Sequence, residues 1–271
     1  MNDDSTVSWK HNSPEATRDP ELLKKVLDVL GAFMRTYFRA EVHGMDRMPK
    51  GAALVVSNHS GGALATDLPV FAAEFVRMFG HERPFFVLAH DVLFKGPLGR
   101  TLRRCGLVPA DRETAVELLR SGGVTMVFPG GDYDAARPFY AAHRIDFNGH
   151  LGYVRTALEA GVPIVPVVSI GGQETQVFLS RGRALIKRAR LDRLLRAQAL
   201  PVAFGFPFGF SVVFPVNVPL PSKLVTSVLQ PIDLTEFGVQ PDPSIVDAFV
   251  REVMQRELDR LARARRFPVI G

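Results

Sequence analysis

Residues 52–59 read AALVVSNH, an apolar run that ends in polar side chains. An uninterrupted apolar run of this length is typical of a strand that is buried on both faces of a sheet. Comparable runs follow at 84–88, 124–128 and 164–168, and stretches with helical periodicity, such as 152–160, lie between them. Strands that alternate with helices predict an α/β fold in which a mostly parallel central sheet is flanked by helices.

The composition narrows the class of protein. The chain has 271 residues, of which 46% are hydrophobic, so it can bury a sizeable core and is not disordered as a whole. Cys105 is the only cysteine, which excludes a disulfide scaffold and a zinc site built on thiolates. The sequence contains no G-x-S-x-G, G-x-G-x-x-G, G-K-S/T or H-E-x-x-H motif. We therefore expect no serine nucleophile elbow, no resident cofactor and no metal.

The chain divides into four predicted regions. Residues 1–19 are polar and predict a disordered tail. Apolar residues recur at helical spacing in region 20–45, which predicts an amphipathic helix that either packs on the core or lies on a membrane, and we expect membrane association. The α/β domain is predicted at 46–240, and a charged amphipathic helix that packs on it at 241–271.

The net charge of +5 comes from one window of the sequence. Residues 181–196 carry seven Arg or Lys side chains and one Asp, so the remainder of the chain is close to neutral. A local basic patch indicates a polyanionic partner, either anionic lipid or nucleic acid. No zinc-finger, RNA-recognition or helix-turn-helix signature accompanies the patch, so we expect an anionic membrane surface and no nucleic acid.

A histidine with a nearby acid follows the first predicted strand. Asn58 and His59 come directly after the apolar run, and Asp67 lies eight residues beyond His59. A histidine at the carboxyl end of a strand faces the crevice where a base can work, and a carboxylate can fix its tautomer. The spacing alone is weak evidence, because many such pairs are helix caps or core hydrogen bonds. The intervening Gly61 and Gly62 favour chemistry, since glycines let a ligand approach the backbone closely.

Three further blocks follow in order: GLVPADR at 106–112, FPGGDYD at 128–134 and VPIVPV at 162–167. Together with the Asn58–His59 block, they resemble the glycerolipid acyltransferase superfamily, which includes the lysophosphatidic acid acyltransferases. That family carries N-H-x4-D, G-x-x-F-I-x-R, F-P-E-G-T and V-P-I/V-x-P-V in this order. The resemblance implies that region 46–240 is an acyltransferase domain.

Two departures from the family pattern bear on the substrate and the site. Leu64 occupies the position of the family's Asp, so Asp67, the nearest acid, is assigned its role. Gly130 occupies the position of the family's Glu, which belongs to the acceptor pocket for phosphate-bearing substrates. The P-G-G sequence and the proline-rich run at 215–223 are similar to the mono- and diacylglycerol acyltransferase-like branch. We therefore expect an acceptor less polar than lysophosphatidic acid.

The resemblance also implies a mechanism. The thioester of acyl-CoA, the expected co-substrate, is already activated, so no covalent acyl-enzyme is needed. His59 would remove the proton from the acceptor hydroxyl as it attacks the thioester carbonyl, and Asp67 would orient and stabilise His59.

Four further residues are predicted to bind substrate. The backbone of Gly130 and Gly131 would hold the oxyanion or a phosphate, or would serve turn geometry alone. Arg112 would pair with a phosphate of coenzyme A or of the acceptor, or would form a surface ion pair. Arg137 would supply part of the acceptor binding that Gly130 cannot.

Residues 197–222 carry no charged side chain, although prolines and glycines exclude a membrane-spanning helix. Phe204, Phe206, Phe208 and Phe210 alternate, which predicts a strand or an extended loop. This segment either lines an acyl-chain tunnel, dips into the membrane interface or forms an unusual core loop.

The sequence thus predicts an acyl-CoA-dependent O-acyltransferase that acts on a glycerolipid, either a lysophospholipid or a mono- or diacylglycerol, in lipid biosynthesis or remodelling. We expect it on the cytoplasmic face of a membrane, bound peripherally or monotopically. Two alternatives stay open. The donor or acceptor could be an acyl carrier protein or a non-glycerol alcohol, or the chain could be a catalytically silent lipid-binding module that kept the fold.

Overall fold

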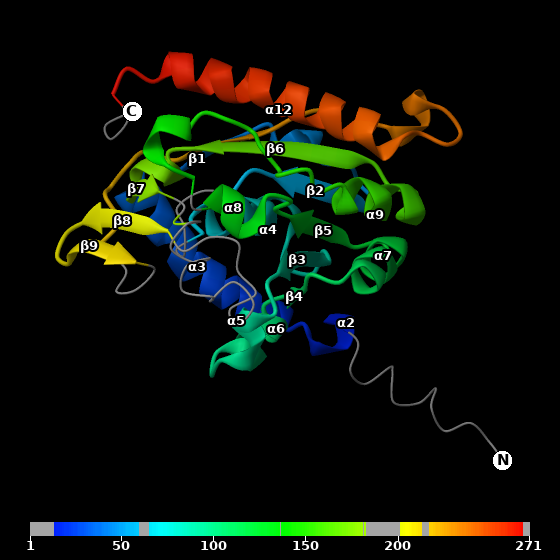
Figure 1. Ribbon diagram of the computed structural model, residues 1–271. Coiled ribbons are helices and arrows are strands. Elements are labelled where there is room, and N and C mark those ends of the chain that lie inside the picture. The colour runs from blue at the N-terminus through cyan, green and yellow to red at the C-terminus, as the bar shows by residue number, and fades with distance from the viewer. Residues whose placement is uncertain are drawn as a thin grey trace.

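The computed structural model describes residues 14–59, 65–135, 137–180, 182, 201–212 and 217–267, and every structural statement below refers to them. A central sheet lies between two layers of helices (Figure 1). The basic window at 181–196 lies outside the described residues apart from Gly182, and so do Gly61, Gly62 and Leu64.

The central sheet has seven strands in the order β1-β10-β6-β2-β5-β3-β4. Their bounds are β1 Glu41–His43, β2 Ala53–Ser57, β3 Phe85–Ala89, β4 Leu107–Pro109, β5 Val124–Val127, β6 Ile164–Ile170 and β10 Val225–Val228. The five strands from β6 to β4 are parallel, whereas β10 runs antiparallel to β6 and pairs in parallel with β1. The predicted α/β fold with a mostly parallel sheet is confirmed.

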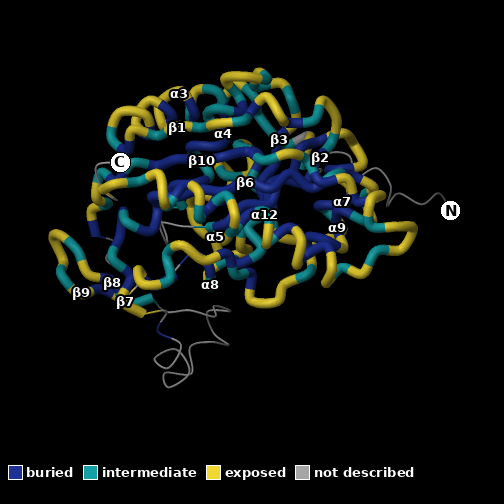
Figure 2. Tube along the Cα trace, turned by 90° about the horizontal axis from the view of Figure 1, so that it is seen from above, coloured by how far each residue is buried: buried dark blue, intermediate teal, exposed yellow. Residues whose placement is uncertain are grey.

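Helices cover both faces of this sheet (Figure 2). One layer contains α3 (Pro20–Tyr37) and α4 (Asp67–Phe79), and the other contains α7 (Arg112–Arg120), α9 (Gly152–Ala160) and α12 (Pro243–Ala264). The alternation of side chains along β2 supplies both cores: Ala53 and Val55 pack with the α3–α4 layer, and Leu54 and Val56 pack with the α9–α12 layer. Burial on both faces explains why the strand reads as a continuous apolar run.

Shorter elements connect these layers. The short helices are α2 (Pro14–Thr17), α5 (Val92–Lys95), α6 (Gly99–Arg104) and α8 (Gly131–Ala135). The 3-10 turns are η1 (Met45–Arg47), η3 (Phe139–Ala141), η4 (Gly172–Glu174) and η5 (Leu234–Phe237). α5, α8 and η4 follow the carboxyl ends of β3, β5 and β6, and therefore gather at one edge of the sheet.

The N-terminal helix packs on the domain through one face. Asp19 caps α3 by accepting a hydrogen bond from the Leu22 amide at 2.9 Å, and Pro20 occupies the first turn. The buried residues of α3 are Leu23, Leu27, Gly31 and Met34. Core packing is therefore one role of this helix.

The predicted disordered tail at 1–19 is too long. Residues 14–17 form α2, and the Asp19 amide donates to the Arg104 carbonyl at 2.8 Å. Arg18 donates to the His81 carbonyl at 2.5 Å, which ties this segment to the loop before β3. The correction has a long-range cause, because these partners lie far away in the sequence. Residues 1–13 lie outside the described part of the chain.

The C-terminal helix packs as its pattern predicts. Asp242 caps α12 by accepting from the Ser244 amide at 2.8 Å. Val246, Val250, Met254, Leu258 and Leu261 are buried against the sheet at intervals of three or four residues.

A second, smaller sheet follows the carboxyl end of β6 and contains β7 (Val177–Ser180), β8 (Val202–Gly205) and β9 (Gly209–Val212). It is antiparallel and projects from the side of the domain, with β8 and β9 in yellow in Figure 1. The alternating phenylalanines lie on this β8–β9 hairpin, as the extended pattern predicts. Within the described parts of the chain, no helix has both the length and the apolarity needed to cross a membrane.

Candidate active site

The site lies where two neighbouring strands end. β2 and β5 pair in parallel, with Val56 opposite Val127, so the residues that follow them meet at the same edge of the sheet. The ring of His59, two residues after β2, lies against the ring of Phe128 with their centroids 4.5 Å apart. The expectation that these two loops share one site is therefore confirmed.

Asn58 fixes the end of β2. Its side-chain amide donates to the Ser169 carbonyl at 2.9 Å, and its side-chain oxygen accepts from the Ser169 amide at 2.8 Å. Both bonds are buried, and Ser169 belongs to β6, the other neighbour of β2. This double bond holds the position from which His59 emerges.

His59 and Asp67 come together despite the altered spacing. The Nδ1 atom of His59 lies 3.3 Å from Oδ2 of Asp67. The Asp67 side chain is 1% exposed and that of His59 is 17% exposed. Asp67 is the first residue of α4, so the helix N-terminus supports its negative charge. Because Nδ1 faces the carboxylate, Nε2 is the ring nitrogen that is left for proton transfer.

Asp134 holds the backbone of the histidine. Its Oδ2 atom accepts a hydrogen bond from the His59 amide at 2.6 Å, and its Oδ1 atom pairs with Arg137. Burial raises the pKa of the Asp134 carboxyl above its ordinary value, an effect that the Arg137 guanidinium opposes. Sequence reasoning assigned Asp134 no role at the site and missed this contact, which spans 75 residues.

Arg137 lies beneath the site. Its side chain is 1% exposed, and besides Asp134 its donors reach the carbonyls of Ala142 at 2.9 Å, of Arg144, and of His59 at 3.4 Å. A buried guanidinium whose donors meet its own chain does not face an acceptor molecule. The predicted acceptor-binding role is therefore replaced by a positioning role beneath His59.

The two glycines serve the turn that accommodates Asp134. A methyl group on Gly130 would overlap the Asp134 side chain, so the glycine lets Asp134 approach the loop. This explains why the position of the family's Glu carries no side chain. Gly131 adopts a left-handed φ of +49°, and its amide donates to the Phe128 carbonyl at 3.0 Å. The Gly131 amide therefore closes the turn, which is the alternative to substrate binding that the sequence left open.

Arg112 forms an ion pair on the surface of the domain. It begins α7 with a 53% exposed side chain, and its guanidinium pairs with Glu159 at 2.5 Å. Glu159 lies in the last turn of α9, which leads to the amino end of β6. The guanidinium thus forms the surface ion pair that was the alternative to phosphate binding.

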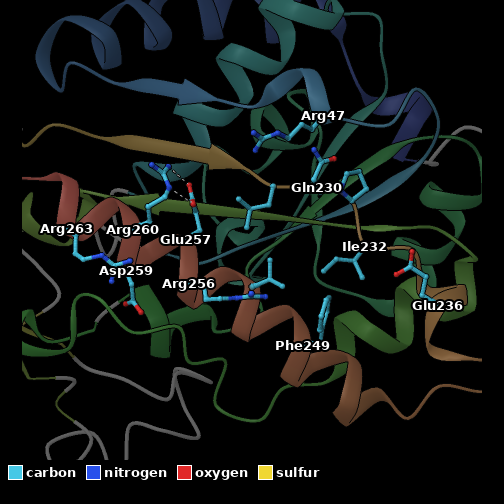
Figure 3. Close-up of a pocket in the computed structure, with 13 residues that line it drawn as sticks. Arg47, Gln230, Ile232, Glu236, Phe249, Arg256, Glu257, Asp259, Arg260 and Arg263 are labelled. Carbon is cyan, nitrogen blue, oxygen red and sulfur yellow. Dashed lines mark hydrogen bonds and ion pairs between the residues drawn. The ribbon is translucent and has the colours of Figure 1, made fainter.

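The structure also has a groove of about 840 Å³ (Figure 3). It is lined by the segment after β10 and by α12, and its wall includes Ile232 and Phe249. Since β10 is antiparallel to β6, this groove lies at the amino edge of the sheet, opposite His59. Arg260 in its rim pairs with Glu257 at 2.7 Å. The groove therefore does not belong to the candidate active site.

Comparisons with known proteins agree with this arrangement. Residues 39–170 match the family model for acyltransferases. The chain is 33% identical over 248 residues to an uncharacterized protein of Mycobacterium tuberculosis, covering 89% of this chain and 66% of that one. It is 30% identical over 224 residues to the mouse "DGAT1/2-independent enzyme synthesizing storage lipids", covering 82% of this chain and 64% of that one. The chain thus spans slightly less than two thirds of these curated relatives.

The fold is shared with a solved enzyme. The crystal structure of the 1-acyl-sn-glycerophosphate (LPA) acyltransferase from Thermotoga maritima superposes with a TM-score of 0.53 at 20% sequence identity, covering 90% of this chain and 84% of that one. The matched family region contains His59, Asp67 and Asp134, and it ends with β6. The sequence blocks and the family match together identify residues 39–170 as an acyltransferase domain.

Proposed function

We propose that this protein transfers a fatty acyl group from acyl-CoA to a hydroxyl group of a glycerolipid, with His59 as the general base. The observation that carries the proposal is the His59–Asp67 pair, 3.3 Å apart at the carboxyl edge of an acyltransferase fold. In the reaction, His59 Nε2 takes the hydroxyl proton while the oxygen attacks the thioester carbonyl. The new C–O bond forms, the C–S bond breaks, and the proton passes to the departing thiolate of coenzyme A.

Neutral mono- or diacylglycerol is the acceptor that the site favours. Gly130 leaves no room for the carboxylate of the family's acceptor pocket, and Arg137 and Arg112 are engaged elsewhere in ion pairs. A phosphate-bearing acceptor would therefore find less charged recognition here. The name of the mouse relative, an enzyme synthesizing storage lipids, supports a neutral glycerolipid.

An acceptor panel tests the proposed reaction. Release of free thiol from acyl-CoA is measured with monoacylglycerol, diacylglycerol, lysophosphatidic acid, a lysophospholipid with a large headgroup, or no acceptor. We expect release that depends on an acceptor and is fastest with the neutral glycerolipids. A strict requirement for lysophosphatidic acid would refute the neutral acceptor. Thiol release with an acylated acyl carrier protein as donor, but not with acyl-CoA, would refute the proposed donor. No release under any condition would identify a catalytically silent lipid-binding protein.

Asp67→Asn should lower the turnover number about 100-fold or more and leave the KM for the acceptor nearly unchanged. The amide keeps the shape of the buried side chain, but it no longer stabilises the imidazolium that forms during proton transfer. Steady-state kinetics with the best acceptor measure both constants. Asp132→Asn is the matched control, because Asp132 is an exposed acid in the neighbouring helix α8. A loss of turnover in the control and not in Asp67→Asn would reassign the partner of His59.

A further inference from the structure

The β8–β9 hairpin presents large aromatic side chains to solvent. Phe204, Phe206, Phe208 and Phe210 are 48%, 78%, 53% and 73% exposed. The hairpin positions that are buried hold the small residues Ala203 and Ser211 instead. This distribution is the reverse of the usual one, and neither a core loop nor the lining of a closed tunnel would have it.

Side-chain hydrogen bonds from Asn217 stabilise the turn of the hairpin. The side-chain oxygen of Asn217 accepts from the Phe208 amide, and its nitrogen donates to the Gly209 carbonyl and to the Ser211 hydroxyl, each at 3.2 Å. Asn217 is 4% exposed. The buried side chain of Asn217 thus stabilises the turn of the hairpin, and the phenylalanines of this turn point into solvent.

The apolar surface continues onto α3. On α3, Phe33 stacks on Tyr37 with their ring centroids 5.2 Å apart, and the Tyr37 hydroxyl donates to the Pro219 carbonyl at 2.7 Å. Next to Pro219, the Val218 amide donates to the Phe206 carbonyl of the hairpin at 2.8 Å. Along this path the exposed apolar side chains are Val29, Leu30, Phe33, Val218 and Leu220. We call the surface formed by these residues and the four hairpin phenylalanines the α3–hairpin surface.

This surface is attached to the edge of the sheet that carries the candidate active site. The small sheet follows β6 directly after η4, and in η4 the Gln173 side chain donates to the Asp134 carbonyl at 3.3 Å. Next to it, η3 packs against β7 and exposes Phe139 and Tyr140. Exposed apolar residues therefore extend from the loops around the site to the tip of the hairpin.

We propose that the α3–hairpin surface docks this protein on a lipid bilayer, with the tip of the hairpin inserted among the headgroups. Exposed aromatic side chains on a charge-free segment suit the membrane interface, where their apolar rings leave water. The charge of the chain supports an anionic bilayer: Ser180 and Val202 are ladder partners, so the connection between them starts and ends on this small sheet. By sequence, that connection contains the basic window 181–196.

Vesicle flotation of the full chain tests the proposal. Wild type is compared with the double variant Phe206→Ser/Phe210→Ser on vesicles of phosphatidylcholine and of phosphatidylcholine mixed with phosphatidylserine. The control double variant is Val239→Ser/Ile245→Ser, which removes apolar side chains that are 99% and 61% exposed near the start of α12, away from the hairpin (Figure 1). We expect the hairpin variant to bind at least about tenfold more weakly on both vesicles, and the control to bind like wild type.

Salt separates the two contributions to binding. Added salt should weaken the binding of wild type to anionic vesicles but leave the difference between wild type and hairpin variant, because burial of phenylalanine is not screened. Equal flotation of wild type and hairpin variant would overturn the proposal. The proposal would also be overturned if wild type is a dimer on size exclusion and the hairpin variant a monomer, while both float equally. That result would identify the surface as an interface between copies of this chain. Because flotation needs no turnover, this result is independent of the proposed reaction.

Discussion

Replacing His59 with alanine lowers acyl transfer about 10²–10⁴-fold, the contribution expected of a positioned general base. The loss falls on turnover, because the imidazole acts on the acceptor proton in the transition state and contributes little to ground-state binding. Stability should change little, since the side chain is partly exposed and its ring lies against the single ring of Phe128. Thiol release from acyl-CoA measures the activity, and thermal unfolding checks the fold.

His90→Ala is the matched control for this experiment. His90 is exposed and directly follows β3 at the same edge of the sheet, where its Nδ1 accepts from the Val92 amide at 3.2 Å. We expect this variant to keep nearly full activity. Turnover like that of wild type in a folded His59→Ala protein would refute the general-base mechanism.

Replacing Arg137 with methionine destabilises the protein by about 3–5 kcal/mol, because it leaves the Asp134 carboxylate buried without its cation. Activity should fall as well, since Asp134 holds the amide of His59. Urea unfolding gives the free energy of unfolding. Arg77→Met is the control: Arg77 is 62% exposed and pairs with Glu74 on the same helix, so its loss should cost less than about 1 kcal/mol.

The double variant Asp134→Leu/Arg137→Met tells positioning from stability alone. It removes both charges, so much of the lost stability should return. Leucine offers no acceptor for the His59 amide, and turnover should therefore stay reduced. A single Arg137→Met variant that unfolds like wild type would show that the buried pair does not support the site.

The strands and the two main catalytic candidates could be predicted from local sequence. Burial on both faces turns β2, β3, β5 and β6 into apolar runs, and the polar residues that follow β2 and β5 stand out against them. His59 and Asp67 were found from the family motif, although the spacing left the pairing open. It took the folded chain to show that α4 begins at Asp67 and brings its carboxylate to 3.3 Å from the imidazole.

The arginines were harder to interpret, because a side chain's burial depends on what packs over it. Arg112 stands in a motif and Arg137 near one, yet the first is 53% exposed in a surface ion pair and the second is 1% exposed. Arg137 is enclosed by carbonyls from Ala142, Arg144 and His59, of which His59 lies 78 residues away in the sequence. No local pattern records such an enclosure.

Apolar and charge periodicity along the chain were sufficient for the α/β class, the packing of α12 and the extended form of the phenylalanine segment. The contact of Asp134 with a backbone amide, the reason for Gly130 and the outward direction of the phenylalanines required the tertiary structure. A backbone amide has no residue-type signature, and an alternating pattern is the same whichever face of a strand meets the core. Those features depend on which distant segments come together, and that is settled only when the sheet is assembled.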